Sequence, residues 1–440
     1  MGACIRCHIQ RAKCEPNEAD QDNPAAPCKT CLNVDKTSKK TIHNIPCLRY
    51  KLTSVVIYRA GGLQLTQRFT HTEVKDVASF GPTFEMKMSQ GLCREPVTLQ
   101  VREYVPRHGD VLHREFAGGA ATESVVAMPA LCLENVEKTA KYFTKYILAN
   151  SLAGLEEAGR EEHEIVRRTL AMIGRHCQEL PVSGSDPLPT TGSTTGTSKV
   201  YKSQKELMTV VVNLWFAIRH GIGTASVCSQ LPTAKGQNAA PGAPSDRSVP
   251  RMIVAQFDSI RHERIYKEFC PKVLKTYESH LTSGNRDTWF TLYLVTFLFL
   301  TLVGSASRDR LRHARQVAGD EARETRYGPA DHPTTRFVEE LQNSGVMLLL
   351  YWTYFKRADL MKVDWAKRSP LVAPYQVEFM QWTVQELEKA RDGIPQTPSD
   401  GCWEDNLFWI SRMFVSAPSE GNAWSPPEQF DRSKPSVGRE

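Results

Sequence analysis

The spacing of apolar residues predicts that the chain is largely helical from residue 133 onward. Leu133, Val136, Ala140, Phe143 and Ile147 recur at intervals of three and four residues, as on one buried face of a helix. Seven further stretches have the same period: 155–180, 204–221, 250–269, 285–304, 334–361, 374–392 and 405–415. This pattern predicts a mostly α-helical domain over residues 133–415.

Residues 51–132 have a different pattern, with short runs rich in β-branched residues. The runs 55–58 (VVIY) and 97–101 (VTLQV) are typical of strands. We therefore expect a mixed connecting segment at 51–132 that contains a short β-like part.

Three stretches lack the composition of a packed core. Residues 182–199 and 232–249 are rich in small residues and proline, and residues 416–440 are rich in Pro, Ser and charge. We expect two mobile insertions within the helical domain and a disordered tail.

The most apolar stretch, 289–303 (WFTLYLVTFLFLTLV), has three threonines within it and charged residues soon after it. It is shorter than the roughly twenty residues that cross a bilayer. The sequence therefore predicts a buried core helix and no membrane partner.

Cysteine is distributed unevenly along the 440 residues. Six of the twelve cysteines lie within the first 47 residues, and no apolar leader follows Met1. We expect a cytosolic or nuclear protein with reduced thiols, in which clustered thiols indicate a metal site. The net charge of +6 is too diffuse to identify a partner.

The spacing of the six cysteines narrows the kind of metal site. It reads Cys4-x2-Cys7-x6-Cys14-x13-Cys28-x2-Cys31-x15-Cys47. Each C-x2-C pair can bring two thiolates to one tetrahedral zinc. Three arrangements remain open from the residues alone. They are a four-cysteine zinc ribbon, two zinc ions that share six thiolates, and an iron–sulfur cluster.

The segment CIRCHIQRAKC, followed by CKTC and PCLRY, resembles the fungal-type Zn(2)-Cys(6) binuclear zinc cluster of fungal transcription factors. The likeness lies in the two C-x2-C halves, the basic six-residue interval between Cys7 and Cys14, and Pro27 before the fourth cysteine. The resemblance implies two Zn²⁺ ions bridged by Cys4 and Cys28. Cys7 and Cys14 would complete one metal site, and Cys31 and Cys47 the other.

The same resemblance implies double-stranded DNA as the partner, read at CGG-like triplets. Arg11 aligns with the family's base-reading lysine and Lys13 with the lysine before the third cysteine, while His8 replaces a common arginine or lysine. An arginine fork can reach guanine O6 and N7 together. Other basic side chains are expected to contact phosphates, which position a protein without reading sequence: Arg6, Lys29, Lys36, Lys39 and Lys40.

Nothing in the sequence indicates catalysis, because the zinc-protease, nucleophile-elbow and P-loop patterns are absent. Residues 50–90 lack sustained heptads, and Gly61, Gly62 and Pro82 interrupt them. We therefore expect either a monomer or a homodimer that pairs through the helical domain.

These observations predict a small metal-stabilised binuclear zinc cluster at 1–50, followed by the connecting segment and a helical regulatory domain. The predicted function is a nuclear, zinc-dependent, sequence-specific transcription factor that regulates RNA polymerase II transcription. The alternative is a zinc-stabilised protein–protein scaffold that does not bind DNA. The basic Cys7–Cys14 interval favours the first, since a scaffold has no need of it.

Overall fold

The structure is a computed structural model of the whole chain. It describes residues 3–17, 27–34, 38, 43, 47, 51–59, 61–63, 65–69, 72–73, 75–116, 124–180, 204–221, 225–229, 247–283, 285–318, 327, 333–356, 358–367, 373–394 and 402–415. The expected insertion at 182–199 and the expected tail lie outside these residues, as does most of the insertion at 232–249.

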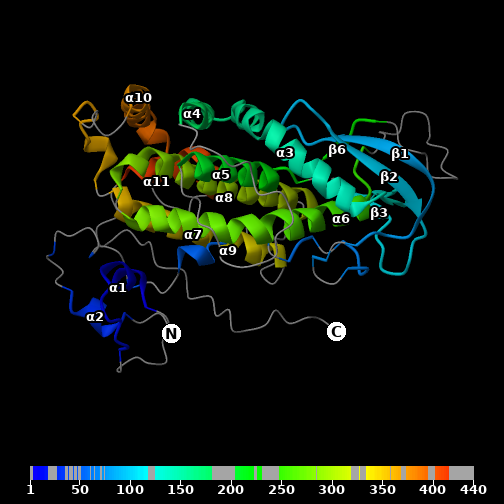
Figure 1. Cartoon of the computed structure of the whole chain (residues 1–440), viewed down its shortest axis with the longest axis horizontal. Helices are drawn as coiled ribbons and strands as arrows, with labels where there is room; N and C mark the ends of the chain where they lie inside the picture. The colour runs from blue at the N-terminus through cyan, green and yellow to red at the C-terminus, as the bar shows by residue number, and fades with distance from the viewer. Residues whose placement is uncertain are drawn as a thin grey trace.

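Two short helices form the N-terminal part, α1 (Ile5–Gln10) and α2 (Lys29–Leu32). They lie beside each other near one end of the helical bundle, and the sheet lies at the opposite end (Figure 1). A 3₁₀ turn, η3 (Leu52–Ser54), follows and packs on α7 and α9 of the bundle.

The main sheet has four antiparallel strands in the order β5-β2-β1-β6. They are β1 (Ser79–Ser89), β2 (Val97–Tyr104), β5 (Leu131–Leu133) and β6 (Ser226–Val227). The ladder between β1 and β2 is irregular between Phe80 and Phe84, where Gly81 has a positive φ of 72°. A separate hairpin joins β3 (His113–Phe116) to β4 (Ser124–Ala127).

The remainder of the described chain is mostly helical, and α8 lies at the centre of the bundle (Figure 1). It packs on α4, α5, α7, α9 and α11. The helices are α3 (Val136–Gly159), α4 (Glu164–Glu179), α5 (Gln204–Arg219), α6 (Arg251–Arg261), α7 (Lys267–Ser283), α8 (Trp289–Ala318), α9 (Pro333–Lys356), α10 (Pro374–Ala390) and α11 (Asn406–Phe414). Shorter turns are η5 (His262–Tyr266, a π-helix), η6 (Arg286–Thr288), η7 (Leu360–Lys362), η9 (Arg391–Gly393) and η11 (Cys402–Glu404).

The apolar stretch that begins α8 is buried, as the sequence predicts for a core helix. Within the described residues one helical segment, Trp289–Arg315, has the length and composition to cross a membrane, and 94% of its apolar window is buried inside the protein. Its threonines are hydrogen-bonded: Thr296 donates to Leu292 O (2.6 Å) and Thr301 to Leu298 O (2.7 Å). These two hydroxyl groups within the core helix therefore have partners.

Several expectations about elements differ from the structure, and one is the helix expected at 285–304, which continues to Ala318. Residues 55–58 form no strand, because the Val56 amide donates to the Ser344 hydroxyl (2.9 Å) while Val55 and Ile57 enter the core. The expected helix 155–180 is interrupted at 160–163, where Glu162 binds Arg308 (2.8 Å). The expected helix 250–269 continues to Ser283 through a π-helical turn and past Pro271.

The sheet and the helices share one hydrophobic core. Met86 and Leu99 of the sheet belong to the same cluster of buried side chains as Phe143 of α3 and Phe297 of α8. Strand β6 comes from the helical region and pairs with β1, and β5 spans the expected boundary at residue 132. The sheet therefore packs as part of the helical domain.

A close approach of α3 to α5 provides a test of this core. A Cβ on Gly154 would lie 2.5 Å from the Phe216 ring, whereas a Cβ on Gly174 of α4 meets nothing within 4 Å. Gly154→Ala should lower the free energy of unfolding by about 1–3 kcal/mol, because the ring must move. Gly174→Ala should raise it by about 0.5–1 kcal/mol, since alanine favours the helix. Urea unfolding of the two variants measures both effects, and changes of the same sign would contradict this packing.

Candidate metal centre

The N-terminal module contains the same local structure twice. Cys4 is the N-cap of α1 and Cys28 is the N-cap of α2, with nearly equal backbone angles (φ −67°, ψ 159° and φ −67°, ψ 155°). Each sulfur accepts a hydrogen bond from the amide three residues later, Cys7 N at 3.4 Å and Cys31 N at 3.3 Å. Each C-x2-C pair therefore forms one turn with both sulfurs on the same side.

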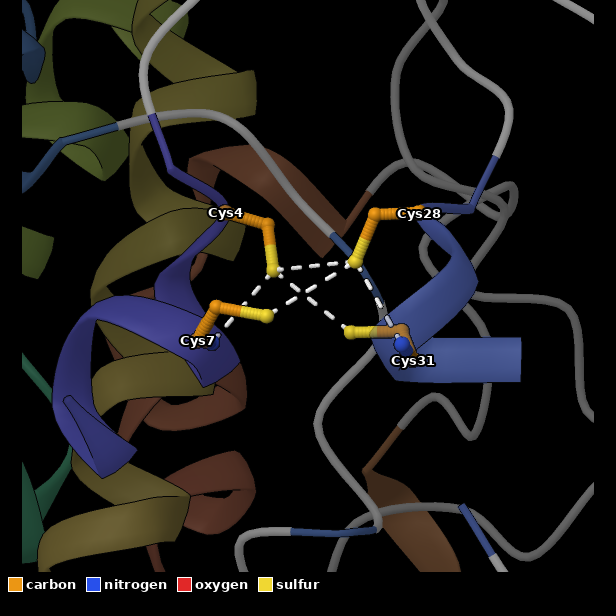
Figure 2. Close-up of side chains that lie close together, drawn as sticks. All are labelled: Cys4, Cys7, Cys28 and Cys31. Carbon is orange, nitrogen blue, oxygen red and sulfur yellow. Dashed lines mark hydrogen bonds between the residues drawn. The ribbon is translucent and has the colours of Figure 1, made fainter. Parts of the chain in front are cut away.

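Four sulfur atoms from the two turns gather in one place (Figure 2). Those of Cys4, Cys7, Cys28 and Cys31 all lie within 4.8 Å of one another, and the four residues are buried. Cys4 Sγ is 4.0 Å from Cys28 Sγ and 3.5 Å from Cys31 Sγ, and Cys7 Sγ is 3.7 Å from Cys28 Sγ. Cys4 and Cys28 each contact a thiol of the other half.

Cys14 and Cys47 join this cluster in equivalent positions. The Cys4 amide donates to Cys14 Sγ (3.4 Å), and the Cys28 amide donates to Cys47 Sγ (3.3 Å). Both residues are partly buried and pack against the other four cysteines. The structure therefore brings all six N-terminal cysteines together.

The chemistry of these donors fits a thiophilic metal ion. All six cysteines are free thiols, with no disulfide among them. Four sulfurs around a tetrahedral zinc, each about 2.3 Å from the metal, would lie about 3.8 Å apart. The observed separations of 3.5, 3.7 and 4.0 Å bracket that value.

The electrostatics of the cluster also favour a bound cation. Burial raises the pKa of Cys7 and Cys31 far above the ordinary range and that of Cys47 to about 11. Burial opposes ionisation of Cys28 as well, but hydrogen bonds from the Cys31 amide and from neighbouring thiols lower its pKa to about 6. Six thiolates this close repel one another, so a cation would be needed for them to ionise together.

Arg6 has a structural position within the module. Its side chain is buried, and it donates to Cys31 O (3.2 Å) and His43 O (2.8 Å). These bonds connect α1 to the segment that carries α2 and to the loop before Cys47. This placement leaves little of Arg6 available for the phosphate contact expected from the sequence.

The other basic candidates lie nearer the surface. His8, Arg11 and Lys13 are exposed, and Lys29 is half-buried. Arg11 ends α1 in the left-handed conformation (φ 53°), and its amide donates to the carbonyl groups of Cys7 and His8. Lys13 forms an exposed ion pair with Glu15 (3.1 Å). Lys36, Lys39 and Lys40 lie outside the described residues.

One face of α1 packs on the helical domain. Ile5 is buried in the same core cluster as Leu52 of η3, and Ile9 packs partly against that cluster. Next to this contact, burial raises the pKa of Glu278 of α7, and the proximity of His8 and Lys51 opposes the rise. The sequence interpretation missed this contact, although the i, i+4 spacing of two isoleucines in a polar module was its signal.

The segment after the module is also held in place. Asp258, in the last turn of α6, accepts a hydrogen bond from the Leu63 amide (2.8 Å). His262, the first residue of the π-helix η5, has its Nε2 atom 2.6 Å from Arg59 O. Gly62 between them has a φ of 65°, and a Cβ there would lie 2.9 Å from the Asp258 carboxylate. The chain between the cysteines and the sheet is therefore attached to α6 and the π-helix.

A model of the KpeA transcription factor family matches residues 60–413. The chain belongs to the KpeA transcription factor family. No match to a curated protein or to a solved structure was found. The matched region contains the sheet and most of the helical domain and begins after the cysteine module. Membership of a transcription factor family supports the expectation of a non-enzymatic role.

Because Arg6 is buried and Arg11 is exposed, their replacement by alanine should affect the stability of the module differently. Arg6→Ala removes the donor from two carbonyl groups and should destabilise the module by about 1–3 kcal/mol. A competing chelator should then take metal from this variant several-fold faster than from the wild type. Arg11→Ala should release metal at the wild-type rate, because its side chain is exposed. Equal release rates for the two variants would contradict the structural role of Arg6.

Proposed function

We propose that this member of the KpeA family is a zinc-dependent, sequence-specific DNA-binding transcription factor that regulates RNA polymerase II transcription in the nucleus. The observation that carries the proposal is the cluster of six thiols, built from two matching turns, next to a domain of a transcription factor family. Clustered free thiols are suited to metal binding, and the interval between two of them is basic.

The proposed centre holds two Zn²⁺ ions, with Cys4 and Cys28 as shared ligands. The positions of Cys4 and Cys28 support their assignment as shared ligands, because each sulfur lies close to thiols of both halves of the module. Cys7 and Cys14 would complete one site, and Cys31 and Cys47 the other. The ions would supply the cohesion that a small module with few large apolar side chains lacks.

The DNA-reading surface is the interval between Cys7 and Cys14, which the ligands would fix at both ends. Arg11 is exposed there and is our candidate for a bidentate contact to guanine within CGG-like triplets. His8 and Lys13 lie on the same short stretch, and Lys29 begins α2. We assign phosphate contacts to these three and to Lys36, Lys39 and Lys40.

A protein scaffold without DNA binding is the second candidate. What favours it is the contact of Ile5 and Ile9 with the helical domain, because the module already packs an apolar face against protein. The two candidate functions differ in what the exposed basic residues bind. In a DNA-binding protein Arg11 contacts DNA, whereas a scaffold does not need it. DNA binding therefore discriminates between them.

The number of metal ions tests the centre itself. The purified full chain should contain two zinc ions, measured by mass spectrometry of the metal. Cys28→Ser should lose both ions, because its sulfur is shared, and Cys47→Ser should lose no more than one. Cys228→Ser is the matched control, since Cys228 is exposed and outside the cluster, and should retain both. One zinc ion per wild-type chain, or iron in its place, would exclude the binuclear zinc centre.

Binding to DNA selected from a random pool tests the reading surface. Arg11→Ala should cost about 1–3 kcal/mol on the selected site and relax the preference there. Lys39→Ala should weaken binding to all sequences about equally and reduce the salt slope by roughly one, because phosphates are alike at every base pair. Equal losses for Arg11→Ala on selected and scrambled DNA would remove its base-reading role. If neither variant changes binding, the scaffold is the better conclusion.

A further inference from the structure

The outward face of α3 carries an apolar patch that nothing in the described chain covers. Three of the large hydrophobic residues that remain exposed lie on this helix: Tyr142, Leu148 and Leu152. The helix lies on the surface of the molecule between α4 and the sheet (Figure 1). We call its exposed residues Lys145, Leu148, Ala149, Leu152, Ala153 and Glu156 the outer stripe. Their spacing of three and four residues places them along one side of the helix.

The outer stripe is charged at both ends, by Lys145 and by Glu156. Neither Lys145 nor Glu156 forms an ion pair within the part of the chain that the structure describes. The neighbouring charges on α3 are paired: Lys138 with Glu134 (4.0 Å), Lys141 with Glu137 (3.9 Å) and Glu157 with Arg160 (3.1 Å). Lys145 and Glu156 are eleven residues apart, or about 16 Å along the helix, so they cannot pair with each other.

We propose that the outer stripe is a self-association surface that pairs with α3 of a second copy of this chain in antiparallel orientation. A two-fold axis level with the Asn150–Ser151 peptide would place Lys145 opposite Glu156 of the other copy, twice. The same axis would place Leu148 opposite Ala153 and Leu152 opposite Ala149. Each large side chain then faces a small one, and each charge faces the opposite charge.

This self-complementarity is the reason to choose a second copy as the occupant. A single two-fold operation satisfies all three pairs, because the stripe has its lysine at one end, its glutamate at the other, and leucine and alanine at matched positions between them. One turn further out, Lys141 would approach Arg160, and each of these already has an acidic partner in its own chain. The seam is about three turns long, so the expected association is weak and depends on concentration.

Pairing through α3 would place two N-terminal modules in one assembly, each on the side of its bundle away from the seam (Figure 1). A gain in DNA affinity from effective concentration then requires a DNA molecule long enough to reach both modules. The association itself does not rest on the proposed DNA binding, so the two can be tested separately.

Charge reversal tests the seam in the full-length chain. Sedimentation velocity over about 1–100 µM should detect a reversible dimer of the wild type. Lys145→Glu and Glu156→Lys should each be monomeric over this range, because like charges would meet at both ends of the seam. An equimolar mixture of the two variants should dimerise again, as should the chain that carries both changes. Lys138→Glu alters charge on the same helix outside the stripe and should dimerise like the wild type.

Two results would overturn the proposal: a wild type that stays monomeric throughout the range, or single variants that dimerise as the wild type does. Circular dichroism establishes whether the variants fold, and the double variant remains decisive if one of them does not. The readout is independent of DNA. A dimer that does not bind DNA would contradict only the proposed function, and a monomer that binds DNA would contradict only the α3 seam.

Discussion

The contact between the sulfur atoms of Cys4 and Cys28 joins the two halves of the N-terminal module. Each of these residues caps a short helix, accepts the amide of the next cysteine and lies close to thiols of the other half. A helix of six residues and one of four have little stability in isolation. The module therefore depends on the sulfur cluster, and the exposed basic residues depend on the module for their positions.

The helical domain is stabilised differently. Its centre is α8, whose apolar residues are surrounded by other helices, and several buried polar side chains are hydrogen-bonded inside the core. His176 of α4 illustrates this: its ring nitrogens lie 2.8 Å from the Tyr375 hydroxyl and 2.9 Å from that of Thr291, which connects three helices. Burial lowers the pKa of His176 to about 4, so it stays neutral at physiological pH. This domain has a large hydrophobic core of its own, whereas the separate buried cluster of the module consists of its cysteines.

Much of this architecture could be predicted from the sequence, because helices are revealed by their period. The stretch 204–221 became α5, and 374–392 became α10, within two residues at each end. The two C-x2-C spacings indicated the two local turns, whereas the position of Cys14 and Cys47 beside them was one of the arrangements that the spacing left open. Local patterns failed where a distant residue decides the conformation. Residues 55–58 have the composition of a strand, but their partner is a serine of α9 rather than a strand edge.

The same limitation explains why the relation between the module and the domain was not predicted. Ile5 is buried in the core cluster of the bundle, and the Leu63 amide donates to Asp258. Both interactions link positions far apart in sequence, which a local periodicity does not reveal. Together they attach the cysteine module to the helical bundle by its own helix and by the segment that follows it. A module held at two places has fewer orientations relative to the bundle than one on a free linker. If the module binds a partner through the interval between Cys7 and Cys14, as proposed, less orientational entropy is lost on binding than for a module on a free linker.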